Sequence, residues 1–117
     1  FNLALYDSDA SLGAGTTAYT TSEEITNTSG TAYSAKGKAL TSVTPTLDSS
    51  TAVCDFADVS WTSASFTARG CLIFNDSHST DASVCAIDFG GDKTATSGTF
   101  TIQFPAASAT AAIIRIA

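Results

Sequence analysis

The sequence predicts an all-β fold, a single jelly-roll-like β-sandwich of about eight short antiparallel strands that spans residues 1–117. Three observations lead to this prediction. Only 14% of the residues are charged, against about 25% in a typical soluble domain. Ser and Thr take the place of charge, which favours strands and turns over helices. Turn signals separate the strand-like stretches at intervals of roughly 8–12 residues, as is typical of a sandwich or barrel.

The N-terminal third is predicted to hold one strand, a long arm and a connection. Asn2–Tyr6 is a short apolar strand. Residues 7–21 are rich in Ser, Gly, Ala and Thr without apolar periodicity. We therefore expect a loop or arm with little to bury, which stays mobile until it meets a partner. Turn signals at 27–30 and 35–38 flank Tyr33, which anchors the connection.

Two or three strands are predicted in the middle of the chain. Ala39–Leu47 alternates weakly. Pro45 marks it as an edge strand or a strand end, because proline cannot donate a ladder hydrogen bond. After a polar turn, Thr51–Phe56 and Asp58–Trp61 form one strand, or two strands broken near Ala57.

The C-terminal half carries the strongest strand patterns. Ser63–Ser65 is predicted as a turn, and the strand after it, Phe66–Asn75, is apolar on both faces. Such a strand is expected to be central and covered twice. The remaining elements are a hairpin loop at Asp76–Asp81, a strand at Ser83–Phe89, a turn at Gly90–Lys93, an alternating strand at Thr99–Phe104, a connector at 105–110 and a closing strand at Ala111–Ile116.

Charge and hydropathy exclude two classes of partner. The formal net charge is −6, and the five Lys and Arg residues are spread along the chain. A nucleic-acid binder needs a basic patch to neutralise phosphates, so we expect no binding to DNA or RNA. No stretch approaches the roughly 20 apolar residues of a membrane-spanning helix, so we expect no membrane partner.

The three cysteines allow at most one internal disulfide. Their spacing matches no zinc site, and small buried apolar residues are the simplest interpretation. In a symmetric hairpin around Asp76–Asp81, Cys71 lies opposite Cys85, with the two Cβ atoms about 4.5–5.5 Å apart. That distance is slightly too long for an unstrained bridge, so we expect reduced thiols.

No set of residues predicts catalysis, a cofactor or a metal ion. His78, the only histidine, lies at a hairpin tip, where nothing holds it as the base of a catalytic triad. Asp7 and Asp9, with Glu23 and Glu24, offer oxygen ligands for calcium. The spacing of a calcium-binding loop is absent, however, and a solvated acidic loop is the simpler interpretation.

Aromatic and basic residues within strands have two possible roles each. Trp61 and the phenylalanines fall on strand periodicity, which favours core packing over a sugar-stacking platform. Arg69 and Arg115 lie in apolar strands, where each is expected to pair with a carboxylate or to contact a neighbouring subunit. The candidate partner-binding residues are these two arginines together with Asp7, Asp9 and Leu12 of the arm.

Four segments resemble small structural proteins of tailed bacteriophages: DFADVSWTSASFTARG at 55–70, and the segments at 87–94, 100–105 and 112–116. The resemblance covers the C-terminal half of the chain well and residues 33–40 loosely. It implies a non-enzymatic virion protein. The expected role is a capsid cement or decoration protein with a jelly-roll-like fold, bound to the major capsid protein on the outer surface of the head.

Two other functions remain open at this point. One is a receptor- or glycan-binding module of a tail or fibre, which would use the aromatic residues around Trp61. The other is a secreted bacterial carbohydrate-binding domain. Because short Thr-rich strands make edges that pair easily, we also expect a homo-oligomer, a dimer or trimer.

Overall fold

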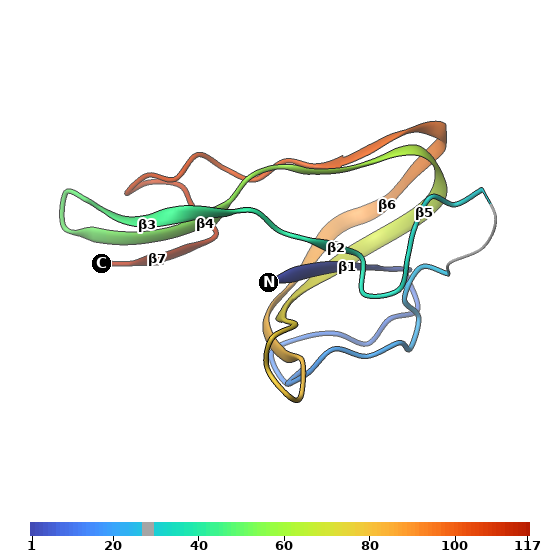
Figure 1. Ribbon diagram of the computed structural model, residues 1–117, viewed down its shortest axis with the longest axis horizontal. Helices are drawn as coiled ribbons and strands as arrows, with labels where there is room; N and C mark the ends of the chain where they lie inside the picture. The colour runs from blue at the N-terminus through green and yellow to red at the C-terminus, as the bar shows by residue number, and fades with distance from the viewer. Residues whose placement is uncertain (27–29) are drawn as a thin grey trace. The chain divides into compact units, whose positions relative to one another are not determined.

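The computed structural model describes residues 1–26 and 30–117. These residues form an all-β protein with two antiparallel sheets, which confirms the predicted all-β fold class. The turn predicted at 27–30 falls mainly on residues 27–29, which lie outside the described part. The strands are β1 (Asn2–Tyr6), β2 (Lys38–Ala39), β3 (Ser42–Asp48), β4 (Thr51–Phe56), β5 (Val59–Asn75), β6 (Ala82–Ile102) and β7 (Ile114–Ile116) (Figure 1).

The described chain forms two compact units. The first unit contains residues 1–39 and 61–100, and the second contains residues 40–60 and 101–117. The first unit holds the four-stranded sheet β2-β1-β5-β6, and the second holds the three-stranded sheet β3-β4-β7. In the part that the structure describes, no helix is long and apolar enough to cross a membrane.

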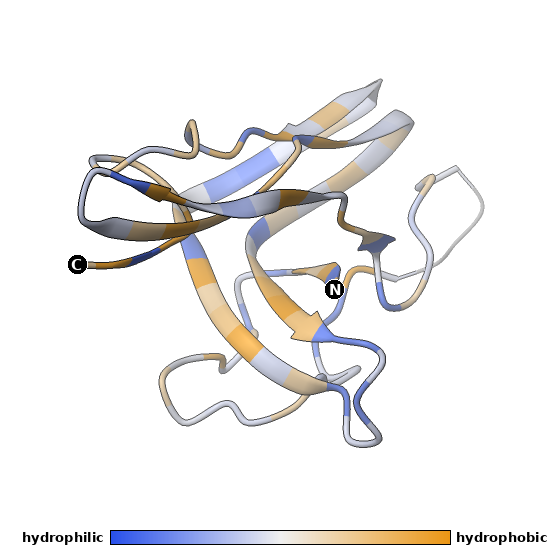
Figure 2. Cartoon of the chain, turned by 60° about the vertical axis from the view of Figure 1, so that its left-hand side comes forward, coloured by the Kyte–Doolittle hydropathy of each residue, from blue (hydrophilic) through white to orange (hydrophobic). Residues whose placement is uncertain are grey.

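Strand β1 is buried on both faces in the first unit. It pairs antiparallel with β5, so that Ala4 lies opposite Leu72 and Leu5 lies opposite Cys71. Side chains of directly opposed residues share a face, and successive residues of β1 therefore enter two different layers. All four of these residues are almost completely buried. The C-terminal part of β5 is accordingly a continuous hydrophobic stretch (Figure 2).

Four aromatic side chains form a cluster in the first unit. The ring of Trp61 lies 6.0 Å from Tyr33, 6.3 Å from Phe66 and 6.2 Å from Phe100, and Phe66 and Phe100 lie 4.9 Å apart. Stacked, edge-on and tilted contacts at these distances are favourable aromatic geometries. Trp61 is only 1% exposed. The core-packing interpretation is therefore confirmed, and a sugar-stacking platform on Trp61 is wrong because the ring has no free face.

Two predicted turns are wrong because both lie inside long strands. Ser63–Ser65 belongs to β5 and Gly90–Lys93 belongs to β6. Ser63 (φ 52°) and Gly90 (φ 76°) nevertheless adopt the left-handed conformation that their sequence signals suggest. Such residues bend or bulge a strand without ending it, and Gly and Ser mark a bulge as readily as a turn.

The connection that leads into β2 depends on Gly37. Its φ is +65°, and a Cβ added there would lie 1.8 Å from the carbonyl oxygen of Leu3 in β1. The Gly37 amide donates to the carbonyl of Ser34 at 2.9 Å, which confirms the turn predicted at 35–38. Only a residue without a side chain lets this turn lie so close to the backbone of β1.

Replacing Gly37 with alanine is expected to lower the free energy of unfolding by at least roughly 2 kcal/mol, through backbone strain and the clash with Leu3. The matched control is Gly15→Ala, because a Cβ at Gly15 meets nothing within 4 Å; it should change stability by less than about 0.5 kcal/mol. Urea unfolding of both variants tests this. Equal midpoints for the two variants would contradict the close approach of the turn to β1.

Candidate partner-binding site

The arm at 7–21 is part of the core of the first unit. Its side chains Ala10, Leu12 and Tyr19 pack on the cluster formed by Ala4, Tyr6, Leu72 and Phe74. The ring of Tyr19 stacks on Phe74 with centroids 4.9 Å apart. The expectation that the arm has little to bury is therefore wrong. Sequence periodicity missed it because single apolar residues of an irregular segment can each fill a separate gap on a sheet.

Backbone hydrogen bonds hold the end of the arm beside the start of β6. The amide of Tyr19 donates to the carbonyl of Asp81 at 3.0 Å, and the amide of Ser83 donates to the carbonyl of Thr17 at 3.0 Å. Ala18 and Ala82 form an isolated antiparallel bridge. The arm is thus fixed in place by the strand that it reaches, as well as by its side chains.

Glu24 is a buried carboxylate that joins the arm to the aromatic cluster. It accepts hydrogen bonds from the hydroxyl of Tyr19 (2.5 Å), the hydroxyl of Tyr33 (2.7 Å) and the amide of Lys36 (2.8 Å). The Tyr33 hydroxyl in turn accepts from the amide of Leu5 in β1 (2.9 Å). Three donors compensate the carboxylate for lost water, which is the condition for burying a charge.

Burial raises the pKa of the tyrosines in this network. The pKa of Tyr33 is raised well above its ordinary value, first by burial and then by its hydrogen bond to Glu24. The pKa values of Tyr6 and Tyr19 are raised for the same main reason, with the negative charge of Glu24 adding to the shift. All three phenols therefore stay protonated in the folded protein under conditions in which a free tyrosine ionises.

An open pocket brings three of the predicted partner-binding residues together. Asp7, Leu12 and Arg69 all line a pocket of about 280 Å³ in the first unit. The residues that line it come from the end of β1, the arm, β5 and β6: Tyr6, Asp7, Ser8, Ala10, Leu12, Gly13, Arg69, Gly70, Cys71, Ala86, Ile87 and Asp88. The pocket therefore combines apolar walls with two carboxylates and the guanidinium of Arg69, at a place where the sequence suggested a partner.

Beside the pocket, β6 carries extra residues relative to β5. The hydroxyls of Thr67 and Thr94 lie 2.8 Å apart, and a Cβ at Gly70 would lie 2.6 Å from the carbonyl oxygen of Ile87. A three-residue step from Thr67 to Gly70 on β5 is thus matched by a seven-residue step from Ile87 to Thr94 on β6. The extra residues bulge out of β6 between these two contacts, and the missing side chain of Gly70 makes room for the carbonyl group of Ile87.

Arg69 binds the two acidic residues of this bulge. Its Nε lies 3.0 Å from Oδ1 of Asp88, and its Nη1 lies 3.8 Å from Oδ1 of Asp92. Asp88 also accepts a hydrogen bond from the amide of Gly90 at 2.8 Å. This amide, followed by Arg69, lowers the pKa of Asp88, and Asp88 raises the pKa of Arg69. The prediction that Arg69 pairs with a carboxylate is confirmed.

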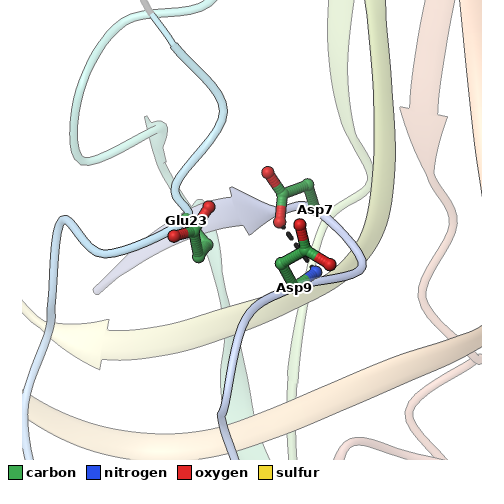
Figure 3. A group of neighbouring side chains, drawn as sticks. All are labelled: Asp7, Asp9 and Glu23. Atoms are coloured by element: carbon green, nitrogen blue, oxygen red, sulfur yellow. Dashed lines mark hydrogen bonds between the residues drawn. The ribbon is translucent and has the colours of Figure 1, made fainter.

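Asp7, Asp9 and Glu23 form a carboxylate group next to the pocket. One oxygen atom from each lies within 4.8 Å of those of the other two, and Figure 3 shows the three side chains turned toward one another. Asp7 accepts a hydrogen bond from the amide of Asp9 at 2.9 Å. Three like charges at this spacing repel one another in the absence of a cation. The group therefore favours a positively charged partner.

The second unit contains a surface that the sequence analysis did not identify. Leu47, Ala52 and Ile116 lie opposite one another across β3, β4 and β7, and Cys54 lies opposite Ile114. These five residues, which we call the apolar face, are all exposed. Leu47 is 71% and Ile116 is 68% exposed. The sequence predicted a strand at Thr51–Phe56, but it did not show which side of that strand is buried.

The predicted site residue Arg115 lies on β7, on the sheet side opposite to Ile114 and Ile116. Its Nη1 donates to the carbonyl of Ala109 at 3.0 Å, and the described residues offer it no carboxylate within ion-pair distance. Of the two roles expected for this arginine, carboxylate pairing is therefore not seen. Arg115 also lies outside the pocket that Asp7, Leu12 and Arg69 line.

The three cysteines are free thiols, as expected, but they are not all buried. Cys54 is exposed on the apolar face, which corrects the expectation of three buried residues; the middle strand of the second sheet simply has one uncovered side. Cys71 is buried, and burial raises its pKa to about 12. Cys85 is half-buried, and burial raises its pKa as well.

No family model, no curated protein and no solved structure matches this chain.

Glu24→Ala should destabilise the protein strongly because two hydroxyls and one amide lose their buried acceptor. We expect a loss of roughly 3 kcal/mol or more, at about 1–3 kcal/mol for each stranded group. The neighbouring exposed Glu23 is the matched control: Glu23→Ala removes one charge of the carboxylate group and should leave stability nearly unchanged. Thermal unfolding compares the two variants. A loss for Glu24→Ala no larger than that for Glu23→Ala would contradict the network.

Stability should fall at alkaline pH. The unfolded chain releases a proton from Cys71 near pH 9 and from its tyrosines near pH 10, whereas the folded protein keeps these protons because the pKa values are raised. A raised folded pKa contributes stability below the unfolded pKa, and that contribution is lost as pH rises. Unfolding midpoints should therefore decline from about pH 9, and more steeply above about pH 10. Phenolate absorbance that rises near pH 10 while the protein remains folded would contradict this.

Proposed function

We propose that this chain is a non-enzymatic structural protein of a phage virion, a cement or decoration protein that binds the outer shell of the head. The resemblance of residues 55–70 and three later segments to structural proteins of tailed phages supports this role. The observation that carries the proposal is the pocket, because three of the five predicted partner-binding residues meet there.

The pocket suits a protruding basic side chain of a shell subunit. Leu12, Ala10 and Ile87 offer apolar walls for the stem of a lysine or arginine. Asp7 belongs both to the pocket lining and to the carboxylate group with Asp9 and Glu23. A cationic end group placed there relieves the repulsion among the carboxylates and gains charge-assisted hydrogen bonds.

Such binding would stabilise the shell by mass action. A protein that binds the assembled shell and not its separated subunits shifts the equilibrium toward the assembled state. With many copies per particle, each contact can be modest. Catalysis has no place in this mechanism, which needs only a rigid β framework that keeps the pocket in shape.

The runner-up function, a receptor- or glycan-binding module of a tail or fibre, has weaker support. Its proposed platform was the aromatic group around Trp61, and that ring is buried in the core. A glycan array is expected to show no binding that depends on Trp61. Copy number separates the two functions further, because a cement protein is present in far more copies per particle than a fibre.

Neutralising the carboxylate group should weaken attachment to the shell. In the double variant Asp7→Asn with Glu23→Gln, occupancy on particles stripped of the protein should require at least about tenfold more protein, since truncating a paired charge at an interface costs 2 kcal/mol or more. Asp76→Asn is the control, because Lys36 retains its second partner Asp81 at 2.9 Å. Quantitative gel analysis of purified particles measures occupancy.

Two results would overturn this function. One is normal occupancy of the double variant at all protein concentrations. The other is unchanged resistance of stripped particles to heat and osmotic shock, compared with particles to which the wild-type protein has been restored.

A further inference from the structure

We propose that two copies of this chain associate through the apolar face of the second unit, with the faces related by a two-fold axis. The inference concerns the β3-β4-β7 sheet alone. It does not depend on the pocket in the first unit or on a role in a virion.

The apolar face has small side chains on its middle strand and larger side chains on the two outer strands. The middle strand β4 contributes the small side chains Ala52 and Cys54. The strands beside it contribute larger side chains, Leu47 from β3 and Ile114 and Ile116 from β7. The face therefore presents a low strip along β4 that lies between taller apolar residues.

A face of this shape is complementary to itself. When a second copy is turned by 180°, the isoleucines of its β7 can lie over Ala52 and Cys54 of the first copy, while the first copy's isoleucines lie over the same strip of the second. Each contact is then made twice, as a two-fold interface requires. The exposed β-branched and leucine side chains leave water in both copies, which is the favourable term.

Charge does not oppose contact between two copies through this face. The chain carries a net charge of −6, so two copies repel one another over most orientations. None of the five residues of the apolar face is charged. The four charged residues of the second unit are Asp48, Asp55, Asp58 and Arg115. Of these, Asp55 and Arg115 belong to β4 and β7 but point to the other side of the sheet.

Attachment to the sheet edges is less favourable than contact through the face. Strand β3 carries Pro45, which lacks an amide hydrogen, and its register with β4 shifts between Val43 and Thr46; both features oppose pairing with another strand. Strand β7 has only three residues. The face is therefore the surface of this sheet that best supports association.

The test is sedimentation velocity of the purified full chain at concentrations from about 10 µM to 1 mM, the range in which a small apolar interface is expected to dissociate. The wild type should pass from monomer to dimer. Ala52→Leu fills the low strip and should weaken the dimer at least tenfold, whereas Thr46→Leu, at an exposed position on the opposite side of the sheet, should leave it unchanged.

Alkylation of Cys54 by iodoacetamide provides a second measurement that needs no variant. The thiol lies on the low strip, so its reaction rate should fall as the wild-type protein dimerises, at least in proportion to the dimer fraction. A wild type that stays monomeric at every concentration would overturn the proposal. So would a dimer in which Cys54 reacts at the monomer's rate, or one that Ala52→Leu does not weaken.

Discussion

The burial of β1 on both faces is the constraint on which the first unit depends. A strand of five residues with apolar side chains pointing both ways needs two separate covers. The arm provides one, through Leu12 and Tyr19. The connection through Tyr33 reaches the backbone of the same strand, because the Tyr33 hydroxyl accepts a hydrogen bond from the amide of Leu5. Glu24 links the arm to this connection with one carboxylate, because Tyr19 and Tyr33 donate to its two oxygen atoms. A polar group thus determines how an apolar strand is enclosed.

Much of the strand pattern could be predicted from the sequence, because strand periodicity reports directly on faces. The central position of Phe66–Asn75, the loop at Asp76–Asp81 and the edge position of Pro45 follow from local chemistry, and the structure agrees with each. The turn signal at Gly90 coincides with a positive φ in the structure. Whether such a residue ends a strand or forms a bulge within it depends on the partner strand. Long-range packing decided what local signals left open.

The candidate site could be predicted from the sequence only in part, because long-range packing also determines which residues meet there. Asp7, Leu12 and Arg69 were identified singly, and the fold brings them to one pocket. Glu24 appeared in the sequence as one of several acidic residues, and nothing local distinguished it from the exposed Glu23. The difference is that Glu24 forms a β-bridge with Tyr6 of β1 and is buried.

The two units also differ in surface chemistry: the first carries the acidic carboxylate group beside the pocket, and the apolar face of the second is neutral.

The order of strands along the chain has a consequence for synthesis on the ribosome. Strand β1 emerges first, yet its main neighbour β5 emerges only after more than fifty further residues. Until then β1 can pair only with the two residues of β2, and a two-stranded ribbon is marginal in water. The second sheet likewise waits for β7, its last strand. Neither sheet can be completed before its last strand has emerged, so the nascent chain carries unpaired apolar strands until then. Holdase chaperones that cover such strands should therefore raise the yield of folded protein.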